Sequence, residues 1–81
     1  SMLPLFEKGT IFVVSHELLP QDGDIVLVQF YNHTPCFRKI FIEDETYIFG
    51  PVSEIVGCEI SKSKNFIIHG VVTKAIQNFH E

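Results

Sequence analysis

The chain has no tryptophan, only two cysteines, and only six basic residues against ten acidic ones in a length of 81. The shortage of basic residues leaves a formal net charge of −4 at pH 7, and such a surface repels phosphate backbones. The sequence also lacks the run of about 18 apolar residues that a membrane-spanning helix needs, and no signal peptide is visible. We therefore expect this segment to bind neither nucleic acid nor a membrane, and to be cytoplasmic.

Metal and disulfide chemistry has little support in the sequence. The two cysteines, Cys36 and Cys58, have no spacing typical of a zinc site, and no pair of histidines has one either. We interpret both cysteines as reduced, partly buried apolar side chains, although the sequence leaves a bond between them open. His33 and His80 are expected in solvent, and His69 in a hydrogen-bonded packing role. No metal and no cofactor is predicted.

What the chain does have is apolar material for a core. Hydrophobic residues make up 46% of it, and eight of them are phenylalanine. A chain of this length forms one small domain, so we expect a single unit over residues 1–81. Ser1 precedes Met2 and is interpreted as a remnant of expression, with the rest being one domain cut from a longer protein.

The apolar pattern predicts short strands divided by turns, and hence an all-β fold. The expected strands cover residues 10–14, Ile25–Phe30, residues 36–42, residues 46–49, a weaker segment at 54–60, and Phe66–Ile76. Glu43, Asp44 and Glu45 would form a solvated hairpin tip. Helix is the competing interpretation of the last segment, but its β-branched residues and Gly70 favour a long strand that bends.

An ordered series of segments covers nearly the whole chain, over about residues 10–77. The segments are Ser15, Pro20, Asp-Gly-Asp at 22–24, Ile25–Phe30, Phe-Arg-Lys-Ile at 37–40, Pro51, and Phe-Ile-Ile-His-Gly-Val-Val at 66–72. In this order and spacing they resemble the LexA-like, or peptidase S24, family, which has the LexA/signal-peptidase-type fold. The resemblance implies strongly coiled β-sheets around a small barrel-like core.

The same resemblance implies a Ser-Lys protease centre, but one position departs from it. Ser15 stands where the family has its nucleophile, and Arg38 stands where it has the lysine general base. Arginine stays protonated at physiological pH and cannot accept the proton of a serine hydroxyl. Lys39 comes one residue later, and alternation along a strand points it to the opposite face. The residue after the serine, usually methionine in the family, is His16, and an adjacent histidine points away from it.

Alternation along residues 36–42 divides their side chains between two faces of the expected strand. Phe37, Lys39 and Phe41 share one face, and Cys36, Arg38, Ile40 and Ile42 share the other. We therefore interpret the protease centre as degenerate. The alternative is a local bulge that turns Lys39 inward and makes an active self-cleaving peptidase with Ser15.

By resemblance, the chain is the C-terminal dimerisation and regulatory domain of a LexA-like or phage-repressor-like transcriptional regulator. Such a domain follows an N-terminal helix-turn-helix domain, so DNA would be contacted only through that missing part, and the partner of this domain would be a second copy. The family places its last strand in the dimer interface, which here predicts Phe66, Ile68, Gly70, Val72 and Lys74. That strand could equally be a central core strand.

Three other interpretations stay open beside this one. The first is the active Ser-Lys peptidase that uses Ser15 and Lys39. The second is a fragment related to signal peptidase, which shares the serine and strand pattern. The third is a stand-alone β interaction module whose likeness to the family is accidental, with Ser15 a simple strand-end hydroxyl.

Overall fold

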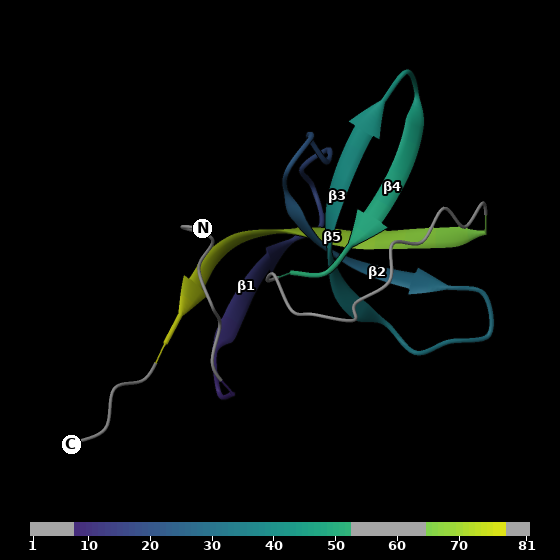
Figure 1. Ribbon diagram of the computed structural model, residues 1–81. Helices are drawn as coiled ribbons and strands as arrows, with labels where there is room; N and C mark the ends of the chain where they lie inside the picture. The colour runs from purple at the N-terminus through teal and green to yellow at the C-terminus, as the bar shows by residue number, and fades with distance from the viewer. Residues whose placement is uncertain (1–7, 53–64, 78–81) are drawn as a thin grey trace.

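The computed structural model describes residues 8–52 and 65–77, which form one antiparallel sheet of five strands (Figure 1). The strands are β1 (Ile11–Ser15), β2 (Ile25–Phe30), β3 (Cys36–Glu43), β4 (Thr46–Gly50) and β5 (Phe66–Ile76). Their order in the sheet is β1-β5-β2-β3-β4, and no helix occurs in this part of the chain. The all-β class is confirmed. The sheet is open, with β1 and β4 at its two edges, so the small barrel-like core that the resemblance implies is not formed in the described residues.

The strand boundaries follow the sequence pattern closely. β2 and β5 have the predicted bounds, β3 and β4 each extend one residue further, and β1 is displaced by one residue toward Ser15. Residues 16–18 form a bend and residues 19–21 are irregular, so this connector contains no helix. The weak strand expected at 54–60 lies outside the described residues.

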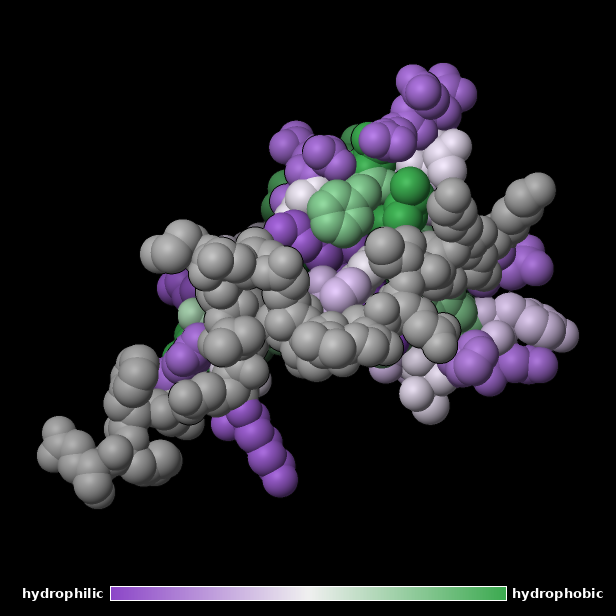
Figure 2. All heavy atoms as spheres, viewed as in Figure 1, coloured by the Kyte–Doolittle hydropathy of each residue, from purple (hydrophilic) through white to green (hydrophobic). Residues whose placement is uncertain are grey.

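A two-residue turn joins β3 to β4. Glu43 pairs with Thr46, and the two residues between them, Asp44 and Glu45, have positive φ values of 48° and 65°. Two positive φ values in succession match the right-handed twist of a hairpin. The acidic tip is therefore an exposed turn, as expected. Figure 2 shows apolar atoms at the surface over the β3–β4 hairpin and hydrophilic atoms toward its tip.

The Asp-Gly-Asp segment has a structural role. Asp22 accepts a hydrogen bond from the backbone N–H of Ile42 at 2.9 Å through Oδ1. Gly23, at φ 90°, donates its N–H to the carbonyl of Ile40 at 2.7 Å, and the N–H of Ile40 donates to the carbonyl of Asp24 at 2.8 Å. The turn before β2 is thus tied to the middle of β3, which fixes the entry of β2 into the sheet.

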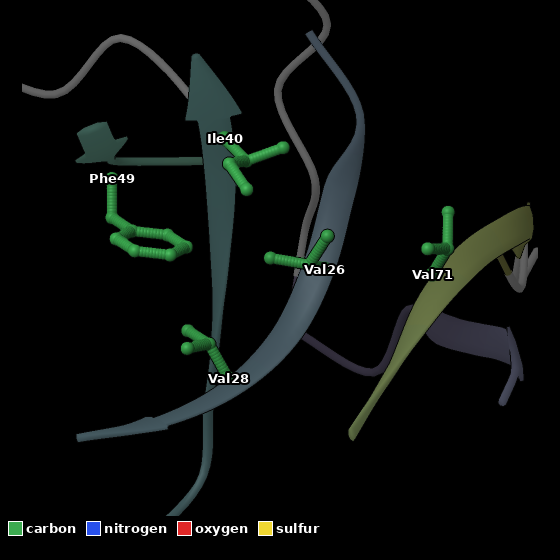
Figure 3. Packing of buried hydrophobic residues seen from close by; sticks show 5 residues of the cluster. All are labelled: Val26, Val28, Ile40, Phe49 and Val71. Carbon is green, nitrogen blue, oxygen red and sulfur yellow. The ribbon is translucent and has the colours of Figure 1, made fainter. Parts of the chain in front are cut away.

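The core lies on one face of the sheet and receives side chains from β2, β3, β4 and β5. Its buried members are Val26, Val28, Ile40, Phe49 and Val71 (Figure 3). Partly buried neighbours pack against them: Phe30, Cys36, Ile42, Tyr47, Phe66 and Ile68. The ring of Phe49 meets Phe30 and Phe66 edge-on, with centroids 5.3 and 4.9 Å away. Cys36, Ile40 and Ile42 share this face, in agreement with the predicted alternation.

β5 is a central strand, and two irregularities bend it. It pairs with β1 on one side and β2 on the other, so the interpretation of this segment as a central strand is confirmed. Its register against β2 skips His69, and its register against β1 skips Thr73. Each extra residue reverses the alternation, so that Ile68 and Val71, three positions apart, both pack toward the core.

Gly70 allows β1 and β5 to lie close together at the bend. A Cβ atom on Gly70 would lie 2.3 Å from Cγ1 of Val14 and 2.8 Å from the carbonyl oxygen of Ser15. Neither contact is tolerable for a real side chain. On this same face, the rings of Phe12 in β1 and Phe37 in β3 have centroids only 4.7 Å apart. Side chains of β1 and β3, two strands with β5 and β2 between them, therefore come into contact across this face.

Candidate functional site

Ser15 ends β1 and is half-buried opposite Val71 of β5. Its hydroxyl oxygen accepts a hydrogen bond from the backbone N–H of Glu17 at 3.3 Å. This bond between residues two apart is typical of a serine at the start of a turn. It accounts for the hydroxyl as a structural group and places it where the chain leaves the sheet.

Ser15 and Arg38 lie in one cross-strand row. Ser15 pairs with Val71, Val71 pairs with Val26, and Val26 pairs with Arg38. Directly paired residues of antiparallel strands share a face, so Ser15 and Arg38 project from the same side of the sheet. Three strand spacings separate them, which amounts to about 14 Å between Cα atoms in a flat sheet.

The guanidinium of Arg38 bonds to its own strand. Nη1 donates to the carbonyl oxygen of Phe37 at 2.8 Å, and the side chain is half-buried. The guanidinium is thus held by a backbone carbonyl of its own strand. Within residues 8–52 and 65–77, no hydrogen bond joins Arg38 to Ser15.

Lys39 projects from the opposite face. It pairs with Ile25 in β2, and the β2–β3 register runs without a shift, so no bulge turns it toward Ser15. Its ammonium nitrogen lies 5.8 Å from the centroid of the Phe41 ring, which is on the same face. In the described part of the chain, the amine of Lys39 is therefore not placed to accept a proton from Ser15.

The residues predicted for a dimer interface have mixed surroundings. Phe66 and Ile68 pack against the core, Gly70 is buried, Val72 is half-buried, and Lys74 is exposed. The two irregularities in β5 explain this mixture, because strict alternation no longer holds along the strand. The interface itself stays a prediction.

A different apolar group is exposed where the β1–β5 ribbon ends. Ile11 and Ile76 are directly paired, and they are 53% and 42% exposed. Val13, on the same face of β1, is 42% exposed. The sequence pattern does not predict this surface, because it indicates a strand at 10–14 without indicating which of its side chains are exposed.

A cleft of about 580 Å³ opens where β2 ends and β5 begins. It is lined by Gln29, Phe30, Tyr31, Asn32, Asn65, Phe66 and Ile67. The carboxamide of Gln29 is fixed there, because Oε1 lies 2.9 Å from Nε2 of His69 and Nε2 donates to the carbonyl of His33 at 3.1 Å. His69 therefore has the expected hydrogen bond, but its side chain is exposed and not packed. The cleft itself was not anticipated from the sequence.

The described residues also bear on metal, disulfide and membrane chemistry. Among them, no group of three or more His, Cys, Asp or Glu side chains is placed to hold a metal ion. Cys36 is a free, half-buried thiol, and Cys58 lies outside the described part. No helix in the ranges that the structure describes is long and apolar enough to cross a membrane.

Comparison with known proteins gives no relative from which to transfer a function. No protein-family model matches the chain, and no curated protein or solved structure matches it.

Proposed function

We propose that the chain is a non-catalytic LexA-like domain, which serves for dimerisation and regulation in a LexA-like or phage-repressor-like transcriptional regulator. The observation that carries the proposal is the register of β3. Arg38, and not Lys39, shares the face and the cross-strand row of Ser15.

The chemistry of Ser-Lys catalysis makes this register decisive. A serine hydroxyl becomes a nucleophile only when a nearby neutral base removes its proton. A guanidinium has no lone pair to accept that proton at physiological pH, and the amine of Lys39 lies over the Phe41 ring on the other face. Ser15 has the backbone N–H of Glu17 as its partner instead.

A regulatory domain without catalysis needs a surface for self-association. The exposed apolar residues at the end of the β1–β5 ribbon, Ile11, Val13 and Ile76, would gain from cover by a second copy. This surface includes Ile76 at the C-terminal end of β5, two residues beyond Lys74, the last of the interface residues that the resemblance predicts. In this proposal the protein is a cytoplasmic homodimer that contacts DNA only through an N-terminal domain.

Serine reactivity tests the proposal directly. The chain and its Ser15→Ala variant are incubated with a fluorophosphonate reagent from neutral to alkaline pH, and labelling is followed by mass spectrometry. Alkaline pH is included because it would favour the neutral amine of any lysine base. We expect no labelling that depends on Ser15. Labelling that disappears in Ser15→Ala would overturn the proposal in favour of an active Ser-Lys peptidase.

A further inference from the structure

The cleft where β2 ends and β5 begins has two walls that are tied together. One wall is the end of β2 with the turn after it, and the other is the start of β5. Phe30 pairs with Phe66 at the last position of the β2–β5 register. Directly beyond this pair, the backbone N–H of Tyr31 donates to the carbonyl of Asn65 at 3.1 Å. Its volume of about 580 Å³ is in the range of sites that hold a small ligand.

Gln29 lines this cleft with a carboxamide of fixed orientation. Its Nε2 donates to the carbonyl oxygen of His33 at 3.1 Å, and its Oε1 lies 2.9 Å from Nε2 of His69. Since Oε1 can only accept, Nε2 of His69 is the donor and carries the proton. A carboxamide can donate two hydrogen bonds and accept two, so this anchored group can still donate one and accept one.

The described residues that line the cleft combine apolar surface with carboxamides. Tyr31 stands on one wall and Ile67 on the other, and their side chains are 72% and 61% exposed. The rings of Phe30 and Phe66 line the space between them and belong to the edge of the core. Apolar walls with a few oriented polar groups are typical of sites for ligands that are partly apolar.

We propose that this cleft binds an extended, uncharged peptide segment through one apolar side chain and the backbone amides beside it. The apolar side chain packs between Tyr31 and Ile67, where exposed apolar surface gains from cover. The donor and the acceptor that Gln29 can still use match the C=O and N–H groups of a peptide backbone. Tyrosine and asparagine are also the residues that peptide- and protein-binding loops use most for rigid contact area and adaptable hydrogen bonds.

Other classes of ligand fit these residues less well. A sugar could use the carboxamides and the Tyr31 ring, but its hydroxyl groups would leave the aliphatic side chain of Ile67 without an apolar partner. A nucleic acid would meet a chain with a net charge of −4. The inference goes beyond the proposed function, because the cleft shares no residue with the row that contains Ser15 and Arg38.

The test follows the backbone and side-chain amide NMR signals of the isotopically labelled chain. The probe is the end-blocked tripeptide Ala-Leu-Ala, and we expect saturating shifts at residues 29–32 and 65–67. Ala-Ala-Ala should bind about tenfold more weakly, because it lacks the apolar side chain. Methylation of the leucine N–H should weaken binding about two- to tenfold, because it removes one hydrogen bond.

Three results of these titrations would overturn the inference. The first is no response of the cleft signals to Ala-Leu-Ala at millimolar concentration. The second is a larger response to maltose than to the peptide, which would assign the cleft to a sugar. The third is a shift of the same signals on dilution of the chain alone, which would assign the cleft to a second copy.

Variants of the cleft residues locate the binding. Tyr31→Ala removes an exposed wall and Gln29→Met removes the carboxamide at similar length, and each should weaken Ala-Leu-Ala binding several-fold. Leu19→Ala, which removes an exposed apolar side chain of the connector after β1, is the matched control and should leave binding unchanged. Undiminished binding in both cleft variants, or an equal loss in Leu19→Ala, contradicts the inference.

Discussion

Arg38 lies in the same cross-strand row as Ser15, with only Val71 and Val26 between them. The two outer residues are half-buried, and the two inner ones belong to the core. Residue 38, to which the resemblance assigns the general base, thus shares a face with Ser15, but its guanidinium cannot accept a proton. Substitutions at residue 38 test both its position and its chemistry.

Arg38→Lys is expected to leave Ser15 unreactive. A lysine side chain reaches about 6 Å from its Cα, whereas three strand spacings amount to about 14 Å in a flat sheet. The amine would therefore remain out of hydrogen-bonding range of the Ser15 hydroxyl. Fluorophosphonate labelling of Arg38→Lys at alkaline pH, with Arg38→Lys/Ser15→Ala as control, measures this. Strong labelling that requires Ser15 would mean that the coiling of the sheet brings the two side chains together.

Gly70→Ala is expected to destabilise the fold, because its new methyl group would collide with Val14 and with the backbone of Ser15. Overpacking of this kind costs about 1–3 kcal/mol. The free energy of unfolding, from urea denaturation, is the measurement.

Val14→Ala tests the same contact from the other strand, alone and combined with Gly70→Ala. Removing Cγ1 of Val14 relieves one of the two collisions, so the double variant should lose less stability than the sum of the single ones. Strict additivity would show that the Val14 contact does not limit the approach of β1 to β5.

Phe49→Ala is expected to cost far more stability than Phe41→Ala. Phe49 is fully buried between Phe30 and Phe66, whereas Phe41 is 38% exposed on the other face. Truncation of a buried phenylalanine costs about 3–5 kcal/mol, a large part of the stability of a domain this small. Circular dichroism and urea denaturation of the two variants provide the comparison. Similar losses would mean that Phe49 is not in a closed core.

The strands and the two faces of β3 could be predicted from the sequence because both depend on local alternation. Residues 36–42 alternate without interruption, and their division into a core face and a Lys39 face holds in the structure. The hairpin tip at Asp44 and Glu45 could also be predicted, because the acidic pair lies between two apolar runs.

The surroundings of β5 could not be predicted in the same way. Each irregularity, at His69 and at Thr73, adds one residue against a neighbouring strand, and a one-residue change of register moves every later side chain to the other face. Gly70 signalled a bend but not its register. The position of β5 between β1 and β2 depends on long-range pairing, which the local pattern does not contain.

The dimer that the proposed function requires is expected to depend on the end of the β1–β5 ribbon. Ile11→Lys and Ile76→Lys place charges on the paired residues of its exposed apolar surface, and desolvating an unpaired charge in an interface is unfavourable. Leu19→Lys is the matched control, because Leu19 is 86% exposed in the connector after β1. Sedimentation equilibrium should give a weaker dimer for the first two variants and an unchanged one for the control. A dimer that tolerates both ribbon variants but is lost in Leu19→Lys would move the interface to the connector beside Ser15.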